Sequence, residues 1–182
     1  GLAIDVLINN AGFGGHGKFH ERDWTADKAM IQLNVVTLTG LTRLLLPGMV
    51  ARGHGRILNL ASMAAFLPGP LQAVYYATKA FVLSFSEAIA NELEGTGVTV
   101  TVLCPGATET GFAATGGLED VKAFANADAP DGVARAGYAG MLRGKTVVVP
   151  SLAKKIATRL PGLLPRGLVT RISRATMEQS DG

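Results

Sequence analysis

The stretch INNAGFGGHGKF, residues 8 to 19, follows a short apolar run and contains a literal G-x-G-x-x-G at Gly12, Gly14 and Gly17. A dinucleotide-binding fingerprint has this spelling, but it opens a helix directly and is followed by an acidic residue about 20 positions further on. Here several residues separate Gly17 from the next helical pattern, and the window 35–40 contains no acidic side chain. We therefore interpret the glycines as a loop after a strand rather than as the phosphate-binding fingerprint.

Strand-like and helix-like patterns alternate along the rest of the chain. The predicted strands cover residues 5–9, 56–61, 98–104 and 145–149, and the predicted helices cover 23–51, 73–93 and 132–142. Within the first helix, Leu38, Leu41, Leu45 and Met49 recur at intervals of three and four, which places them on one face. Strict alternation is typical of an α/β fold with an open parallel sheet and right-handed crossovers.

Three candidate catalytic side chains follow from this arrangement. In open α/β sheets ligands bind beyond the carboxyl ends of the strands, so the loops that begin at Asn9, Ala61 and Pro105 are expected to converge. Ser62 follows one of these strands directly. Tyr75 and Lys79 are four residues apart near the start of the next helix, so they project from one face.

These three residue types suit the reduction of a carbonyl group. A tyrosine titrates near pH ~10, and a neighbouring ammonium lowers that pKa, so Lys79 is expected to make Tyr75 a usable acid and base. Ser62 can donate a hydrogen bond to the oxygen on which charge develops. Because no side chain supplies hydride, a nicotinamide cofactor is implied.

With these motifs together, the chain resembles the short-chain dehydrogenase/reductase (SDR) family in its compact, single-domain branch. The resemblance rests on four stretches: Asn9-Asn10-Ala11-Gly12 after a strand, Asn34 in the long helix, Ser62 with Tyr75-x-x-x-Lys79, and Pro105-Gly106. It implies a Rossmann-like, doubly wound parallel sheet. It also implies that the protein interconverts a carbonyl and an alcohol with NAD or NADP.

The resemblance assigns roles residue by residue. Tyr75 resembles the acid/base, Lys79 the residue that lowers its pKa and holds the nicotinamide ribose, and Ser62 the donor to the substrate oxygen. Asn34 resembles the residue that anchors a water in the proton relay. The implied cofactor contacts are Asn9, Ala11, Gly12, Tyr75, Lys79, Pro105, Gly106, Thr108 and Thr110. The histidines His16, His20 and His54 show no metal-ligand spacing, and we assign no metal site.

The family's adenine-binding turn, T-G-x-x-x-G-x-G, does not occur in the 182 residues. The resemblance therefore predicts an incomplete fold. Residues 1–150 would be the C-terminal portion of a Rossmann-like domain, and residues 151–182 its basic amphipathic tail. The strand at 5–9 would be an edge, and the choice between NAD and NADP cannot be read. The 182-residue chain alone is expected to bind dinucleotide weakly and to turn over little.

Charge is distributed unevenly. Residues 1–131 carry 8 basic and 12 acidic side chains, whereas residues 132–182 carry 9 basic and 2 acidic ones. Three interpretations of the tail remain open: it lies on a membrane surface, extends a subunit interface or caps the substrate pocket. No uninterrupted apolar run reaches the ~18 residues of a membrane span. The single Cys104 favours a reducing, cytoplasmic setting.

The sequence predicts the substrate and the partners only as broad classes. Apolar side chains around 66–71 and 112–124 favour a small apolar ketone or alcohol, and no nucleic acid is expected. The resemblance implies a homo-oligomer formed through the two long helices. Three alternatives stay open: a catalytically silent dinucleotide-binding scaffold or regulatory protein, an inactive fragment, and a nucleotide-sugar epimerase or dehydratase, which also uses a Tyr-x-x-x-Lys pair.

Overall fold

A computed structural model describes residues 3–124, 127–158 and 160–178. It contains a parallel sheet in the order β1-β2-β3-β4. The strands are β1 Val6–Asn9, β2 Gly55–Leu60, β3 Val98–Leu103 and β4 Val147–Val148. The predicted parallel α/β fold is confirmed, although each strand is shorter than, or shifted by a residue from, its predicted range.

The helices also follow the predicted order. The first long helix is continuous from α1 through a π-helical segment, η2, to α2, and the tail forms α6 and α7. The long helices are α1 Trp24–Ile31, η2 Gln32–Thr37, α2 Leu38–Arg52, α3 Ala73–Glu92 and α5 Pro130–Leu142. The shorter ones are α4 Phe112–Gly116, α6 Leu152–Ala157, α7 Arg166–Met177, η1 Phe19–Glu21, η3 Met63–Phe66, η4 Lys122–Phe124 and η5 Leu160–Leu163.

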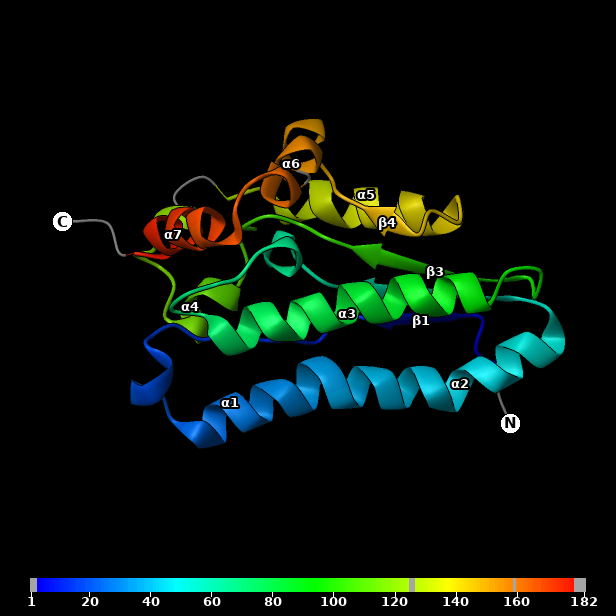
Figure 1. Ribbon diagram of the computed structural model, residues 1–182. Helices are drawn as coiled ribbons and strands as arrows, with labels where there is room; N and C mark the ends of the chain where they lie inside the picture. The colour runs from blue at the N-terminus through cyan, green and yellow to red at the C-terminus, as the bar shows by residue number, and fades with distance from the viewer. Residues whose placement is uncertain (1–2, 125–126, 159, 179–182) are drawn as a thin grey trace.

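Helices cover both faces of the sheet (Figure 1). Strand side chains alternate between the faces, so Ile57 packs with α2 and α3 whereas Leu58 packs with α5. Within the described residues β1 pairs with β2 alone, and it exposes Val6 and Ile8. The strand is thus an edge, as predicted, and its apolar residues lack the cover that the interior strands have.

The helix from Trp24 to Arg52 qualifies, by length and composition alone, as a candidate membrane span. Polar residues interrupt every apolar run in this helix, so a membrane span was not predicted from the sequence. Its inward side packs on β2 and α3 and buries polar groups such as Asp27 and Asn34, which form hydrogen bonds there. Only 22% of its most apolar window is buried, so an apolar outer face remains, including Leu41 and Leu44.

Candidate active site

A cavity of about 790 Å³ lies at the carboxyl ends of the strands, where the loops after β1, β2 and β3 meet. Most of the predicted site residues line it, as the topology requires: Gly12, Ser62, Tyr75, Lys79, Pro105, Gly106, Thr108 and Thr110. The rest of the wall is largely apolar and includes Phe13, Leu67, Phe112 and Phe124. The cavity therefore combines a small group of polar side chains with a predominantly apolar wall.

Ser62, Tyr75 and Lys79 come together from β2 and the first turns of α3. Ser62 lies two residues beyond the end of β2, where its hydroxyl accepts a hydrogen bond from Ala64 N at 3.1 Å and donates one to Pro105 O at 3.4 Å. Lys79 Nζ donates to Leu60 O at 2.8 Å and lies 5.7 Å from the centre of the Tyr75 ring. Both Tyr75 and Lys79 are buried.

Burial dominates the ionisation of Tyr75 and Lys79. It raises the pKa of Tyr75 above its usual value because the phenolate loses hydration, and the nearby Ser62 hydroxyl opposes this only in part. Burial lowers the pKa of Lys79 to about 8. The expected lowering of the Tyr75 pKa by Lys79 is therefore not found. Desolvation dominates the shift, and the Lys79 ammonium is hydrogen-bonded to the Leu60 carbonyl.

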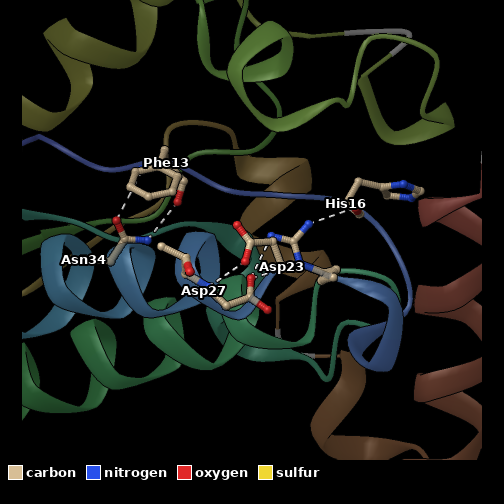
Figure 2. A network of polar contacts seen from close by, with 7 residues as sticks. Phe13, His16, Asp23, Asp27 and Asn34 are labelled. Atoms are coloured by element: carbon tan, nitrogen blue, oxygen red, sulfur yellow. Dashed lines mark hydrogen bonds and ion pairs between the residues drawn. The ribbon is translucent and has the colours of Figure 1, made fainter.

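Asn34 connects the glycine-rich loop to the long helix through hydrogen bonds to the backbone of Phe13. It lies in the π-helical segment η2, where its Oδ1 accepts from Phe13 N at 3.3 Å and its Nδ2 donates to Phe13 O at 3.0 Å (Figure 2). Nδ2 also reaches Thr78 Oγ1 at 3.1 Å, on α3. A Cβ on Gly12 would lie 3.0 Å from Asn34 Oδ1 and 3.4 Å from Lys79 Nζ, so these three residues are immediate neighbours.

Other predicted site residues lie elsewhere or bond locally. Asn9 is buried behind the loop, where its Nδ2 donates to Asn59 Oδ1 at 2.8 Å and to Thr42 Oγ1 at 3.2 Å. Ala11 is exposed and, like Asn9 and Asn34, is not among the residues that line the cavity. Thr108 donates to Gly106 O, and Thr110 Oγ1 accepts from Phe112 N. The amide of Asn9 thus joins β1, β2 and α2 instead of facing the cavity.

An ion pair between the largely buried side chains of Arg22 and Asp27 lies against the glycine-rich loop, and it was not predicted from the sequence. Arg22 donates through Nε and Nη2 to Asp27 Oδ1, at 2.9 and 2.7 Å, and through Nη1 to His16 O at 2.9 Å (Figure 2). A Cβ on Gly15 would lie 2.2 Å from the Arg22 guanidinium, and one on Gly14 would lie 2.7 Å from the Phe112 ring. Close packing of neighbouring side chains therefore accounts for Gly14 and Gly15. No sequence motif marks the ion pair of Arg22 and Asp27.

Asp27→Asn is expected to lower the free energy of unfolding by about 3–5 kcal/mol, because it leaves the Arg22 guanidinium partly unpaired in a buried site. The side chains of Arg22 and Asp27 are only 15% and 2% exposed. The matched control is Asp23→Asn, four residues earlier. Asp23 caps α1 from an exposed position, and asparagine caps as well as aspartate does. Urea denaturation of both variants measures the difference, and equal midpoints would contradict a structural role for the pair.

Residues of the C-terminal helices form part of the cavity wall. Lys154 of α6 donates to the Asp128 carboxylate and lies over Gly106, where a Cβ would come within 3.0 Å of its Nζ. His16 Nε2 is hydrogen-bonded to Met177 O of α7 at 2.8 Å, so the glycine-rich loop touches the end of that helix. Neither contact was predicted, because both join segments that are far apart in the sequence.

Comparisons with known proteins agree with this architecture. A model of the short chain dehydrogenase family matches residues 2–119. The chain is 43% identical to the ketoacyl reductase HetN of Nostoc sp. over 110 residues, which cover 60% of this chain and 38% of that protein. It is 42% identical over 110 residues to the very-long-chain 3-oxoacyl-CoA reductase of Rattus norvegicus, covering 58% of this chain and 35% of that one.

Solved structures show the same fold. A short-chain dehydrogenase from Sphingobium yanoikuyae, solved in complex with NADPH, superposes with a TM-score of 0.78 at 32% identity. The match covers 88% of this chain and 61% of that one. The chain thus spans less than half of the two curated relatives' length and somewhat more of the solved structure.

Proposed function

Because the chain belongs to the short chain dehydrogenase family, we propose that it carries the catalytic part of an NAD(P)-dependent oxidoreductase that interconverts a carbonyl and an alcohol. The observation that supports this most directly is the convergence of Ser62, Tyr75 and Lys79 at one apolar cavity. A hydroxyl donor, a phenol and an ammonium are the groups that protonate and stabilise a carbonyl oxygen during reduction.

In the proposed mechanism the chain's own residues handle the oxygen of the substrate. The Ser62 hydroxyl donates a hydrogen bond to the carbonyl oxygen and orients it. Tyr75 then gives its phenolic proton to that oxygen as negative charge develops there. Tyr75 is protonated at neutral pH and so has a proton to give, but its burial makes it a weaker acid than an exposed tyrosine. Lys79 lies beside the ring and favours the phenolate once the proton has left.

The dinucleotide supplies the hydride when it is bound, and the chain offers residues for its nicotinamide end. Gly12 and Gly106 present bare backbone at the cavity, with Lys79 and Lys154 as adjacent cations. Pro105, Thr108 and Thr110 continue this wall, whereas Asn9 and Ala11 do not line it. The set fits the nicotinamide half. We propose NADP as the preferred form, on the strength of the NADPH bound by the Sphingobium yanoikuyae relative.

We further propose that the substrate is a 3-oxoacyl compound with an apolar chain. The apolar wall suits an acyl chain, and two of the relatives carry names of oxoacyl reductases. The test is the oxidation of NADPH, followed by absorbance, with 3-oxoacyl thioesters and with simple ketones of equal chain length. The protein assayed is the product of the complete reading frame that contains this chain. Reduction of neither class with NADPH or NADH would contradict the proposal.

We also propose that the protein forms a homo-oligomer in the cytoplasm. The outer face of α2 exposes Leu41 and Leu44, and α3 exposes Phe81. An exposed apolar face of this kind is typical of a protein–protein contact, and the two long helices can pair with those of a second copy. Sedimentation velocity of the native protein and of Leu44→Gln measures this, with a smaller particle expected for the variant.

A further inference from the structure

The tail exposes a run of aliphatic side chains that the proposed function does not use. Leu152 and Leu163 are 76% and 81% exposed, which is unusual for leucines in a folded protein. Single exposed leucines need no explanation, but a series of exposed aliphatic side chains along neighbouring segments of the chain is a candidate interaction surface. We call this set the tail face, and it consists of Leu152, Ile156, Leu160, Leu163, Leu164, Leu168 and Ile172.

Each of the two tail helices, α6 and α7, has one side that faces the protein and one side that is exposed to solvent. In α7, Val169, Ser173 and Met177 recur every four residues and are buried, whereas Leu168 and Ile172 form a second row that is exposed. In α6, Lys154 lines the cavity, and Leu152 and Ile156, on the other side of the helix, are exposed. The inner sides of these helices therefore contribute to the cavity wall, and the outer sides form the tail face.

Cations accompany the aliphatic side chains. Lys155 and Arg171 are exposed and adjacent in sequence to Ile156 and Ile172, and Arg166 is also exposed. No acidic residue occurs anywhere from 132 to 177. Leucine and isoleucine interspersed with lysine and arginine are the composition of helices that lie in the interface of an anionic bilayer.

We propose that the tail face docks on the surface of an anionic lipid bilayer, with α6 and α7 lying between that surface and the cavity. The cavity wall includes Lys154, Ala157, Thr176 and Met177 from the same two helices, so the cavity lies directly behind the docking surface. An apolar substrate dissolved in the bilayer would then reach Ser62 and Tyr75 along α6 and α7. This last step rests on the proposed function, whereas the docking itself does not.

Charge and composition favour a bilayer over the two competing occupants. A second copy would bring its own Lys155 and Arg171 against those of the first, and such like charges repel. Nucleic acid would attract the cations but would leave the leucines without a partner, because phosphate contacts dominate such interfaces. Figure 1 also shows α6 and α7 on the side of the molecule opposite α1 and α2, so pairing through α2 leaves the tail face open.

Co-sedimentation with vesicles tests the docking without any catalytic readout. The complete protein is mixed with phosphatidylcholine vesicles that contain or lack phosphatidylserine, and the bound fraction is measured as salt is added. We expect binding that requires phosphatidylserine and weakens with salt. Leu168→Gln/Ile172→Gln and, separately, Lys155→Glu/Arg171→Glu are each expected to weaken it by at least about tenfold.

The matched control is Tyr138→Gln/Leu142→Gln on α5, which removes two exposed apolar side chains outside both the tail face and the proposed pairing surface of α2 and α3, and should leave vesicle binding unchanged. Three results would overturn the proposal. One is no binding to anionic vesicles. Another is loss of binding in the control alone. The third is dissociation of the protein into smaller particles by the Leu168→Gln/Ile172→Gln variant in the absence of vesicles, because that result would make the tail face a subunit interface. Vesicle binding by a protein without reductase activity would support the docking and contradict the proposed function only.

Discussion

Tyr75→Phe is expected to lower kcat/KM for carbonyl reduction by about 10²- to 10⁴-fold, the usual contribution of a positioned acid or base. The variant removes one hydroxyl from a buried ring and keeps its packing against Phe112, whose ring centre lies 5.2 Å away. Steady-state kinetics with NADPH and a 3-oxoacyl substrate measure the change.

The chain provides a matched control in the next residue. Tyr76 is also a buried tyrosine on α3, and its side chain packs in the same cluster, so Tyr76→Phe removes an equivalent hydroxyl one position away. We expect Tyr76→Phe to retain activity within about tenfold, since it takes no part in the proposed proton transfer. Similar losses in both variants would assign the effect to packing. Unchanged biological activity of Tyr75→Phe would instead favour the catalytically silent scaffold.

Gly97→Ala is expected to lower the free energy of unfolding by about 3–5 kcal/mol, or to prevent soluble expression altogether. Gly97 lies between α3 and β3 with a φ of +79°, and a Cβ there would lie 2.0 Å from the carbonyl oxygen of Gly53. The Cβ is fixed rigidly to the backbone, and the Gly53 oxygen is itself a backbone atom, so neither can rotate away. The turn after α2 and the turn before β3 would have to separate, and the pairing of β2 with β3 begins at these turns.

Gly95→Ala is the control for backbone strain. Gly95 has nearly the same φ, +80°, yet a Cβ there would meet nothing within 4 Å. Its substitution should therefore cost only the left-handed conformation of an alanine, about 1–2 kcal/mol. Urea denaturation, or the soluble yield where Gly97→Ala does not fold, compares the two variants. Equal effects would mean that the contact with Gly53 is not tight.

The order of elements was predictable because it depends on local patterns. Short apolar and β-branched runs located each strand, and three-to-four spacing of apolar residues marked the long helices, to within a few residues. The alternation of strands and helices implied parallel pairing. That prediction also placed the loops after Asn9, Ala61 and Pro105 at one edge, where the cavity is found. The family resemblance, confirmed by the match over residues 2–119, rested on the same local motifs.

Side-chain partners were not predictable in this way. Asn9 and Gly12 are three residues apart in one motif, yet Asn9 bonds to Asn59 and Thr42 whereas Gly12 lines the cavity. The direction of the Tyr75 pKa shift was wrong because the sequence gives the neighbouring charge of Lys79 but not the depth of burial. No sequence motif indicated the ion pair of Arg22 and Asp27.

By itself the sequence determined the alternation of strands and helices, the place where the loops converge and the residue types available there. These follow from the pattern of apolar and polar side chains along one segment at a time. Tertiary structure alone decided which glycines have no room for a Cβ, where the Asn9 amide points and how burial shifts the pKa values of Tyr75 and Lys79. It also decided that the tail both lines the cavity and exposes its leucines. Each of these depends on atoms brought within a few ångströms by segments far apart in the chain. Desolvation and close contact arise only there.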